Sequence, residues 1–235
     1  MSGTLYLIPL PLAPETALAT LPASITPLVQ RLQYFIVESE KVSRRFLKEL
    51  DRNIDINIRH FGLLNEHTPA SEVRQLLQPA LDGHDIGLMS DAGCPGIADP
   101  GAAAVAHAHR LGIAVQPLSG PSSIVLTLMG SGFNGQRFAF HGYLPVAAHE
   151  RERALRELEA ESRRRNMTQL FIETPYRNRQ LLDTLLKVGH PDTQLCIGAG
   201  LTAADQLLET RSIKAWKMAI PELNKRPAVF AIYCG

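Results

Sequence analysis

The sequence contains two loops of small, rigid residues that could receive a ligand. The first, residues 90–101, reads SDAGCPGIADPG, with three glycines and two prolines in twelve residues. Bare backbone in such a loop can approach a ligand closely, and its N–H groups can meet polar ligand atoms. The second, SGPSS at residues 119–123, precedes a helical pattern, where Ser122 or Ser123 could cap the helix or bond a ligand. The alternative interpretation is that both loops are tight strand-to-helix connections.

Other polar side chains are placed where they could assist a reaction. A base beside an acceptor hydroxyl or amine can accept its proton, and the candidates at strand ends are Glu38, Glu66 with His67, Tyr143 and Glu173. Arg44, Arg45 and Arg177 could hold an acidic or phosphate-bearing substrate. For these arginines the alternative is ordinary salt pairing at the surface.

Several familiar sites are excluded by their missing signatures. The chain has no GxxxxGK[ST], no GxGxxG after a strand and no GxSxG. His107 and His109 are two residues apart on a helical pattern and face different ways, so we expect no metal site. Cys94, Cys196 and Cys234 lack CxxC spacing, which indicates neither a disulfide framework nor zinc.

The elements that must position these residues alternate between short apolar runs and helical patterns. This alternation predicts an α/β fold with mostly parallel sheets. The predicted strands are 5–9, 34–38, 54–58, 86–90, 113–118, 137–141, 169–173, 194–199 and 229–233. The predicted helices are 24–31, 39–50, 69–81, 101–111, 122–129, 148–165 and 175–188. Proline and glycine at 117–121 predict a boundary between two domains, 1–118 and 119–235.

The composition is that of a globular protein. Apolar residues make up 45% and charged residues 20% of the 235 residues, and the net charge is +1. No apolar run approaches the roughly 18 to 20 residues that span a bilayer, so we expect no membrane segment. The three scattered cysteines favour a reducing environment, and we therefore expect a cytoplasmic protein. The balanced charge does not by itself indicate nucleic acid, and the cluster Arg163-Arg164-Arg165 is interpreted as a solvated helix end.

Four motifs together carry a resemblance to a known family. They are SDAGCPGIADPG at 90–101, SGPSS at 119–123, FHGYLP at 140–145 and FIETPYR at 171–177, with NEHT at 65–68 in addition. In this order and spacing they resemble the tetrapyrrole-methylase-like (class III) methyltransferase superfamily, most closely its ribosomal RNA small-subunit methyltransferase I branch. The resemblance covers roughly residues 4–190.

The resemblance implies an S-adenosylmethionine-dependent methyltransferase with two α/β domains and a cofactor cleft between them. It further implies a homodimer that needs no metal. Carried over position by position, it implies cofactor contacts at ten residues of this chain. These are Pro9, Ala92, Gly93, Cys94, Ile97, Ser122, Ser123, Glu173, Thr174 and Ala228.

The chain also departs from the family pattern at three places. The first loop reads Ile8-Pro9-Leu10-Pro11-Leu12 rather than an A-T-P-I-G-N type, and Ala92-Gly93-Cys94-Pro95 stands where many tetrapyrrole methylases have Gly-Gly-Asp-Pro. Ala199–Ala203 lacks the Arg-Glu-Leu-Thr-Lys string of the RNA-methylating branch. Three functions stay open: a methyltransferase with RNA (2'-O-methylation of rRNA) as first candidate substrate, a tetrapyrrole C-methyltransferase, and a cofactor-binding module without turnover.

Overall fold

The computed structural model of the chain describes residues 2–235, except the side chain of Ala70. The chain divides into two compact units, Met1–Ser122 (unit 1) and Ser123–Gly235 (unit 2). The division lies four residues beyond the boundary predicted at 118/119, at the point where SGPSS passes into a helix. Each unit has its own sheet and its own apolar core.

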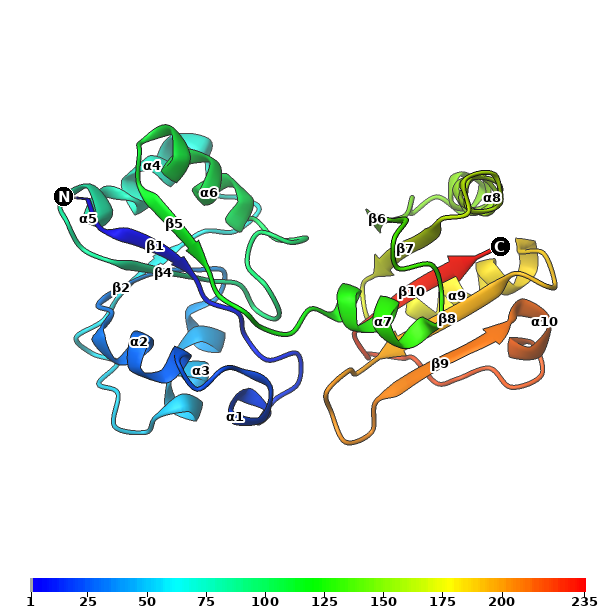
Figure 1. Cartoon of the computed structure of the whole chain (residues 1–235), viewed down its shortest axis with the longest axis horizontal. Helices are drawn as coiled ribbons and strands as arrows, with labels where there is room; N and C mark the ends of the chain where they lie inside the picture. The colour runs from blue at the N-terminus through cyan, green and yellow to red at the C-terminus, as the bar shows by residue number, and fades with distance from the viewer. Residues whose placement is uncertain (1) are drawn as a thin grey trace. The chain divides into compact units, whose positions relative to one another are not determined.

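Unit 1 is built on a parallel sheet of five strands in the order β3-β2-β4-β1-β5 (Figure 1). The strands are β1 (Thr4–Leu7), β2 (Tyr34–Val37), β3 (His60–Leu63), β4 (Ile86–Met89) and β5 (Ala114–Pro117), and every neighbouring pair is parallel. The central strand β4 is buried at all four positions, as expected for a strand covered by helices on both faces.

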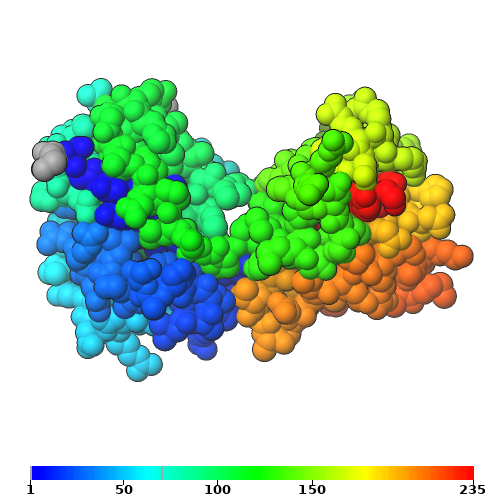
Figure 2. Space-filling view, viewed as in Figure 1, coloured from blue at the N-terminus to red at the C-terminus, as the bar shows by residue number. Residues whose placement is uncertain are grey.

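Helices cover both faces of this sheet. One layer consists of α1 (Ala17–Thr20), α2 (Ile25–Arg31) and α3 (Glu40–Leu50), and the other of α4 (Ala70–Leu76), α5 (Gln78–Leu81) and α6 (Gly101–Arg110) (Figure 1). Strand β2 serves both layers, since Phe35 and Val37 pack with α2 and α3 whereas Ile36 packs with the other layer. In the space-filling view, the first layer forms the blue lower part of unit 1 (Figure 2).

Unit 2 has a mixed sheet in the order β6-β7-β10-β8-β9. Its strands are β6 (Phe138–Tyr143), β7 (Thr168–Glu173), β8 (Gln194–Ala199), β9 (Leu207–Ser212) and β10 (Ala228–Tyr233). Only β6 and β7 pair in parallel, and the other three pairs are antiparallel. The prediction of two α/β domains is confirmed, but a mostly parallel sheet is correct for unit 1 alone. A short turn rather than a helix joins β8 to β9, and only antiparallel strands can be joined so directly.

Helices again cover both faces of the sheet in unit 2. Helix α7 (Ser123–Ser131) lies on one face, where Ile124 and Leu128 pack on the small cluster around Leu170 and Val229. Helices α8 (Ala148–Arg165), α9 (Asn178–Val188) and α10 (Ile213–Trp216) cover the other face and share its larger core. The largest side chain of that core is Trp216, which is 1% exposed and donates its indole N–H to the Leu195 carbonyl at 2.8 Å.

Some elements predicted from the sequence differ from the observed ones, and the reasons are local. Residues 54–58 are turns rather than a strand, because the Asp55 carboxylate accepts the Asn57 N–H and stabilises a turn. The strand lies instead at His60–Leu63. The helix predicted at 69–81 is divided into α4 and α5, because Pro79 has no N–H to continue the first helix. Strand β9 was missed because its residues Glu209–Ser212 are polar.

Replacement of Trp216 by alanine is expected to destabilise unit 2 by about 3–5 kcal/mol, because it opens a cavity and removes a buried hydrogen bond. Urea unfolding followed by far-ultraviolet circular dichroism measures the loss, since the variant has no other tryptophan for fluorescence. Met218→Ala, two residues away at a side chain that is 86% exposed, is the control and should change stability little. A Trp216→Ala protein as stable as the control would contradict this account of the core.

Candidate functional site

Three loops at the carboxyl edge of the unit 1 sheet are tied to one another. Leu10, after β1, and Gly93, after β4, exchange two backbone hydrogen bonds of 2.9 and 3.0 Å. A Cβ atom on Gly120, after β5, would lie 2.2 Å from Cγ of Pro9, so only glycine fits there. The Cys94 thiol points at the Pro121 carbonyl, 3.5 Å away. The three loops therefore form one small-residue platform, and the resemblance predicted contacts on each of them.

The loop 90–101 is held in its shape by backbone geometry and one carboxylate. Gly93 and Gly96 have φ angles of +72° and +84°, which favour glycine over any residue with a side chain. The Asp99 carboxylate accepts the N–H groups of Gly96, at 2.9 Å, and Gly101, at 2.6 Å. Asp99 thus closes the loop and fixes the start of α6.

Carboxylates gather beside this platform. The half-buried Glu38 follows β2, and its Oε2 accepts the backbone N–H of Asp91 at 3.2 Å. Burial raises the pKa of Glu38, and the nearby carboxylates of Asp91, Asp99 and Glu66 raise it further, against the opposing effect of that hydrogen bond. Burial also raises the pKa of Asp91. This edge of the sheet is therefore negatively charged and suits a cation.

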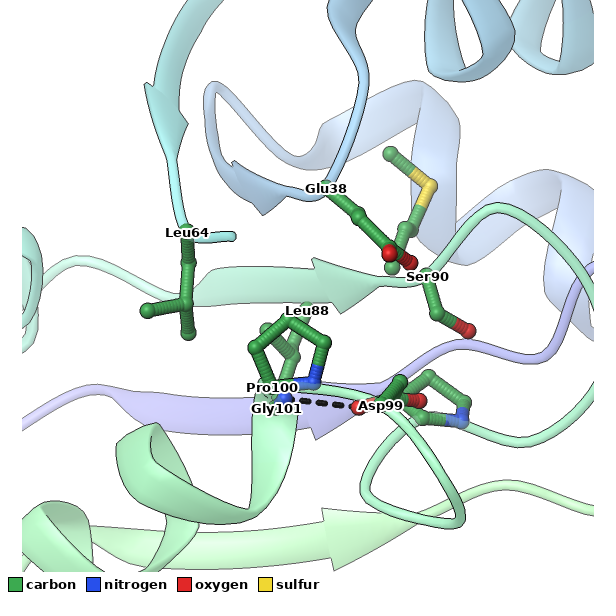
Figure 3. Close-up of a pocket in the computed structure, with 9 residues that line it drawn as sticks. Glu38, Leu64, Leu88, Ser90, Asp99, Pro100 and Gly101 are labelled. Carbon is green, nitrogen blue, oxygen red and sulfur yellow. Dashed lines mark hydrogen bonds between the residues drawn. The ribbon is translucent and has the colours of Figure 1, made fainter. Parts of the chain in front are cut away.

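A small pocket lies between Glu38 and the start of α6 (Figure 3). Ser90 lies beside Glu38, Asp99 and Gly101 lie opposite it, and Leu64 and Leu88 complete the lining. Its volume of about 10 Å³ is room for about one water molecule. The pocket is too small for a nucleoside, and the half-buried Glu38 carboxyl is one of its lining groups.

Most of the predicted residues of unit 1 meet on the platform. Pro9, Ala92, Gly93, Cys94 and Ile97 all belong to the tied loops, and Ile97 is 50% exposed. Ser122 is the last residue of unit 1.

Glu66 and His67 lie closer to solvent than the platform residues. Their side chains are each 85% exposed and are 3.5 Å apart. Glu66 acts on the site electrostatically, since its charge is one of those that raise the pKa of Glu38.

The predicted residues of unit 2 form a separate cluster. Glu173, at the end of β7, has a side chain that is 1% exposed, and its Oε1 accepts the Thr174 N–H at 2.6 Å and two N–H groups of Arg177 at 2.7 and 3.0 Å. Ala228 pairs directly with Glu173 across the sheet. Glu173 therefore stabilises the turn that carries Thr174, and Arg177 is neutralised by it.

Two further predicted residues belong to unit 2. Tyr143 ends β6 and is 57% exposed, and Ser123 begins α7.

Three residues of the platform were not among the predicted site residues. Asp91 orients Glu38 through its N–H, Asp99 closes the loop, and Gly120 lets the third loop approach Pro9. Asp99 had a detectable signal, because an aspartate before Pro-Gly commonly accepts neighbouring backbone N–H groups. Among the described residues, no group of three or more His, Cys, Asp or Glu side chains could hold a metal ion, and no helix is long and apolar enough to cross a membrane.

Comparison with known proteins gives a consistent set of relatives. A ribosomal RNA small subunit methyltransferase I from Escherichia coli O157:H7 is 33% identical over 183 residues, which make up 78% of this chain and 59% of that protein. The protein of the same name from Micromonospora olivasterospora is 32% identical over 209 residues, 87% of this chain and 61% of that protein. The chain is similar to the ribosomal RNA small-subunit methyltransferases I. The resemblance indicated by the four motifs is thereby confirmed, although the chain spans less than two thirds of the length of these relatives.

Solved structures show the same fold at lower identity. The crystal structure of the methyltransferase CobJ matches with a TM-score of 0.65 and 15% identity, over 100% of both chains. A conserved hypothetical protein from Aeropyrum pernix K1 matches with a TM-score of 0.66 and 15% identity, over 97% of this chain and 84% of that one. No family model matches the chain.

The raised pKa of Glu38 makes its effect on stability depend on pH. Ionisation of Glu38 is less favourable in the folded than in the unfolded chain, so the folded protein loses stability as pH rises through the folded pKa. Glutamine stays neutral at every pH. We therefore expect Glu38→Gln to melt at a higher temperature than the wild type at about pH 7, with the gain vanishing below about pH 4.

Thermal melting across this pH range measures the effect. Glu72→Gln, at an exposed carboxylate in the first turn of α4, is the control and should give no gain at neutral pH. A gain for Glu38→Gln that stayed the same at acidic pH would show that its cause is not ionisation.

Proposed function

We propose that this chain is an S-adenosylmethionine-dependent methyltransferase whose acceptor is RNA, with 2'-O-methylation of ribosomal RNA as the reaction. The names of the relatives support the RNA substrate. The observation that carries the proposal is the bridge between Leu10 and Gly93 beside the carboxylates of Glu38 and Asp91. It presents bare backbone and negative charge together at the carboxyl ends of parallel strands, where ligands of open α/β sheets bind.

The residues of the platform fit this cofactor. When bound, S-adenosylmethionine supplies a methyl group already activated by a sulfonium cation. Exposed Ala92 and Ile97 leave room for an apolar ligand surface, and Gly93 lies between Leu12 and Pro121 with no side chain of its own. The carboxylates of Glu38 and Asp91, with no cation paired to either of them among the described residues, offer the charge that a sulfonium requires.

Glu38 is the best candidate for a base at this site. A carboxylate whose pKa is raised holds a proton more readily, so it accepts one from a hydroxyl acceptor more efficiently at neutral pH. The Asp91 N–H holds its Oε2 in place. Glu66, His67 and Tyr143 stay predictions as catalytic residues, and so do Ser123, Glu173, Thr174 and Ala228 as cofactor contacts.

We propose two further properties. The resemblance supports a homodimer, and free thiols at Cys94, Cys196 and Cys234 support a cytoplasmic location. A tetrapyrrole acceptor has no support among the names of the curated relatives. A module without turnover keeps one specific observation in its favour, namely the uncharged Ala199–Ala203 after β8.

We expect the purified protein to bind S-adenosylmethionine without added metal. Its melting temperature should rise with ligand, by the equivalent of about 2.7 kcal/mol at one hundred times the Kd. Gly93→Ala should weaken binding at least about tenfold, because a side chain at this φ strains the platform. Gly112→Ala is the matched control, since Gly112 has a similar φ of +70° but lies in the turn between α6 and β5.

Titration calorimetry at millimolar ligand decides this prediction. Absence of both heat and thermal shift in the wild type would refute the cofactor. Equal weakening in both glycine variants would refute the platform as its site.

The catalytic part of the proposal is tested by transfer of tritium from labelled S-adenosylmethionine. We expect label in small-subunit ribosomal RNA, resistant to alkali at the modified nucleotide because a 2'-O-methyl group blocks cleavage there. Gly93→Arg, a much bulkier change at the same positive φ, serves as the background. Binding of the cofactor with no label in RNA above that background would favour the module without turnover, and label in a porphyrinoid would favour the tetrapyrrole alternative.

A further inference from the structure

A row of basic side chains runs along the solvent side of α3. Lys41, Arg45 and Lys48 are four and three residues apart, so they share one face of the helix. Arg52 follows just beyond the end of the helix, and its carbonyl accepts a hydrogen bond from the Lys48 ammonium at 2.9 Å. All four are exposed, whereas Ser43, Phe46, Leu47 and Leu50 on the other side of the helix are buried. We call these four residues the basic row. The helix layer that carries it forms part of the surface of unit 1 (Figure 2).

Ion pairing does not account for the basic row. Among the described residues, Lys41, Arg45 and Arg52 have no carboxylate within 4.0 Å, and Lys48 donates only to the Arg52 carbonyl. The neighbouring Arg44 is different, because it pairs with Glu40 at 3.0 Å and lies over the Phe61 ring. Five of the nine Lys and Arg residues of unit 1 lie within residues 41–52, although the unit as a whole has more acidic than basic residues.

The row is only partly favourable for the helix itself. Like charges three and four residues apart repel each other, and Lys41 lies in the first turn, where the helix dipole disfavours a cation, whereas Lys48 lies in the last turn, where a cation is favoured. By contrast, the run Arg163-Arg164-Arg165 lies at the end of α8, where cations are favoured, and Arg164 and Arg165 both pair with Glu161. Unlike that run, Lys41 and Arg45 have neither a favourable helix end nor a carboxylate partner among the described residues, and an anionic partner would supply the opposite charge.

A cavity connects the basic row with the platform. It has a volume of about 200 Å³ and is lined by Pro11, Pro14 and Phe46 on its apolar side, and its charged lining residues are Arg45, Glu49 and Asp91. The Glu49 carboxylate already accepts the Ala17 N–H at 2.8 Å. Arg45 therefore belongs both to the row and to this cavity, and Asp91 belongs both to the cavity and to the contact with Glu38. The two prolines and the guanidinium suit a nucleobase and its phosphate, whereas Phe46 is 3% exposed and belongs to the core.

We propose that the basic row is the surface of unit 1 that binds the RNA backbone, with Arg45 directing one nucleotide into the cavity beside Asp91. This inference rests on the proposed function for its choice of polyanion. It assigns Lys41, Arg45, Lys48 and Arg52 to phosphates, and it leaves Arg44 and Arg177 in the ion pairs that they already form with Glu40 and Glu173. The contacts are electrostatic, so they position RNA without selecting its sequence.

The test measures binding of a fluorescein-labelled single-stranded RNA by anisotropy over a series of salt concentrations, at full chain length. In the triple variant Lys41→Ala, Arg45→Ala, Lys48→Ala, the slope of log K against log salt should fall by about 2, because each phosphate contact on a single strand contributes about 0.7. The charge-retaining variant Lys41→Arg, Arg45→Lys, Lys48→Arg should keep the wild-type slope. Arg74→Ala, an exposed arginine on α4 in the opposite helix layer, should keep both slope and affinity.

The outcomes separate this inference from the proposed function. A triple variant that melts like the wild type and binds RNA with an unchanged slope would overturn the inference, as would a wild type that does not bind RNA. Equal loss in Arg74→Ala would show that only overall charge matters and would also overturn it. Failure of the wild type to bind S-adenosylmethionine, measured separately, would refute the proposed function while leaving the RNA comparison interpretable.

Discussion

The reciprocal hydrogen bonds between Leu10 and Gly93 are the constraint on which the rest of the site depends. Strand β1 lies between β4 and β5 in the sheet, so the loops after these three strands emerge side by side. Without the bridge these would be separate connections. With it, Gly120 packs on Pro9, Cys94 points at Pro121, and the chain after β4 turns so that the Asp91 N–H reaches Glu38. The left-handed φ of Gly93 is the local requirement that makes this path available to the backbone.

The same geometry separates the charges of unit 1. Carboxylates meet at the carboxyl edge of the sheet, where burial and mutual repulsion raise the pKa of Glu38. Five of the nine cations of unit 1 lie instead at residues 41–52, on α3 and just beyond its end. Of these five, only Arg44 is paired with a carboxylate of the described residues, that of Glu40. A cationic cofactor would neutralise the carboxylates at the edge of the sheet, and a polyanionic substrate would neutralise the cations along the helix. One cavity is lined by residues of both groups, Asp91 and Arg45.

The sequence predicted what depends on local pattern and missed what depends on partners. The apolar run of β4 and the glycine loop after it were correct, because burial on both faces and positive φ angles leave marks in composition. The strand predicted at 54–58 was wrong because Asp55 forms a turn, and the direction of the strands in unit 2 was wrong because an apolar run looks the same in either direction. The sequence alone could not distinguish Arg44, Arg45 and Arg177 from one another. The contacts show that Arg44 and Arg177 are paired with carboxylates, whereas Arg45 has no carboxylate partner among the described residues.

The segment after β8 also differs from α3 in how its charge is arranged. In the RNA-methylating branch that the motifs resemble, a charged string stands at this position, whereas here Ala199–Ala203 is uncharged. The turn is closed from within the unit: a Cβ on Gly200 would lie 2.9 Å from the Arg226 guanidinium, which donates to the Asp205 carbonyl and lies 3.5 Å from the Asp205 carboxylate. The cation at this turn is therefore occupied. The cations of α3 differ, since Lys41 and Arg45 have no carboxylate partner among the described residues. The two positions therefore differ in whether their positive charge is already neutralised within the chain.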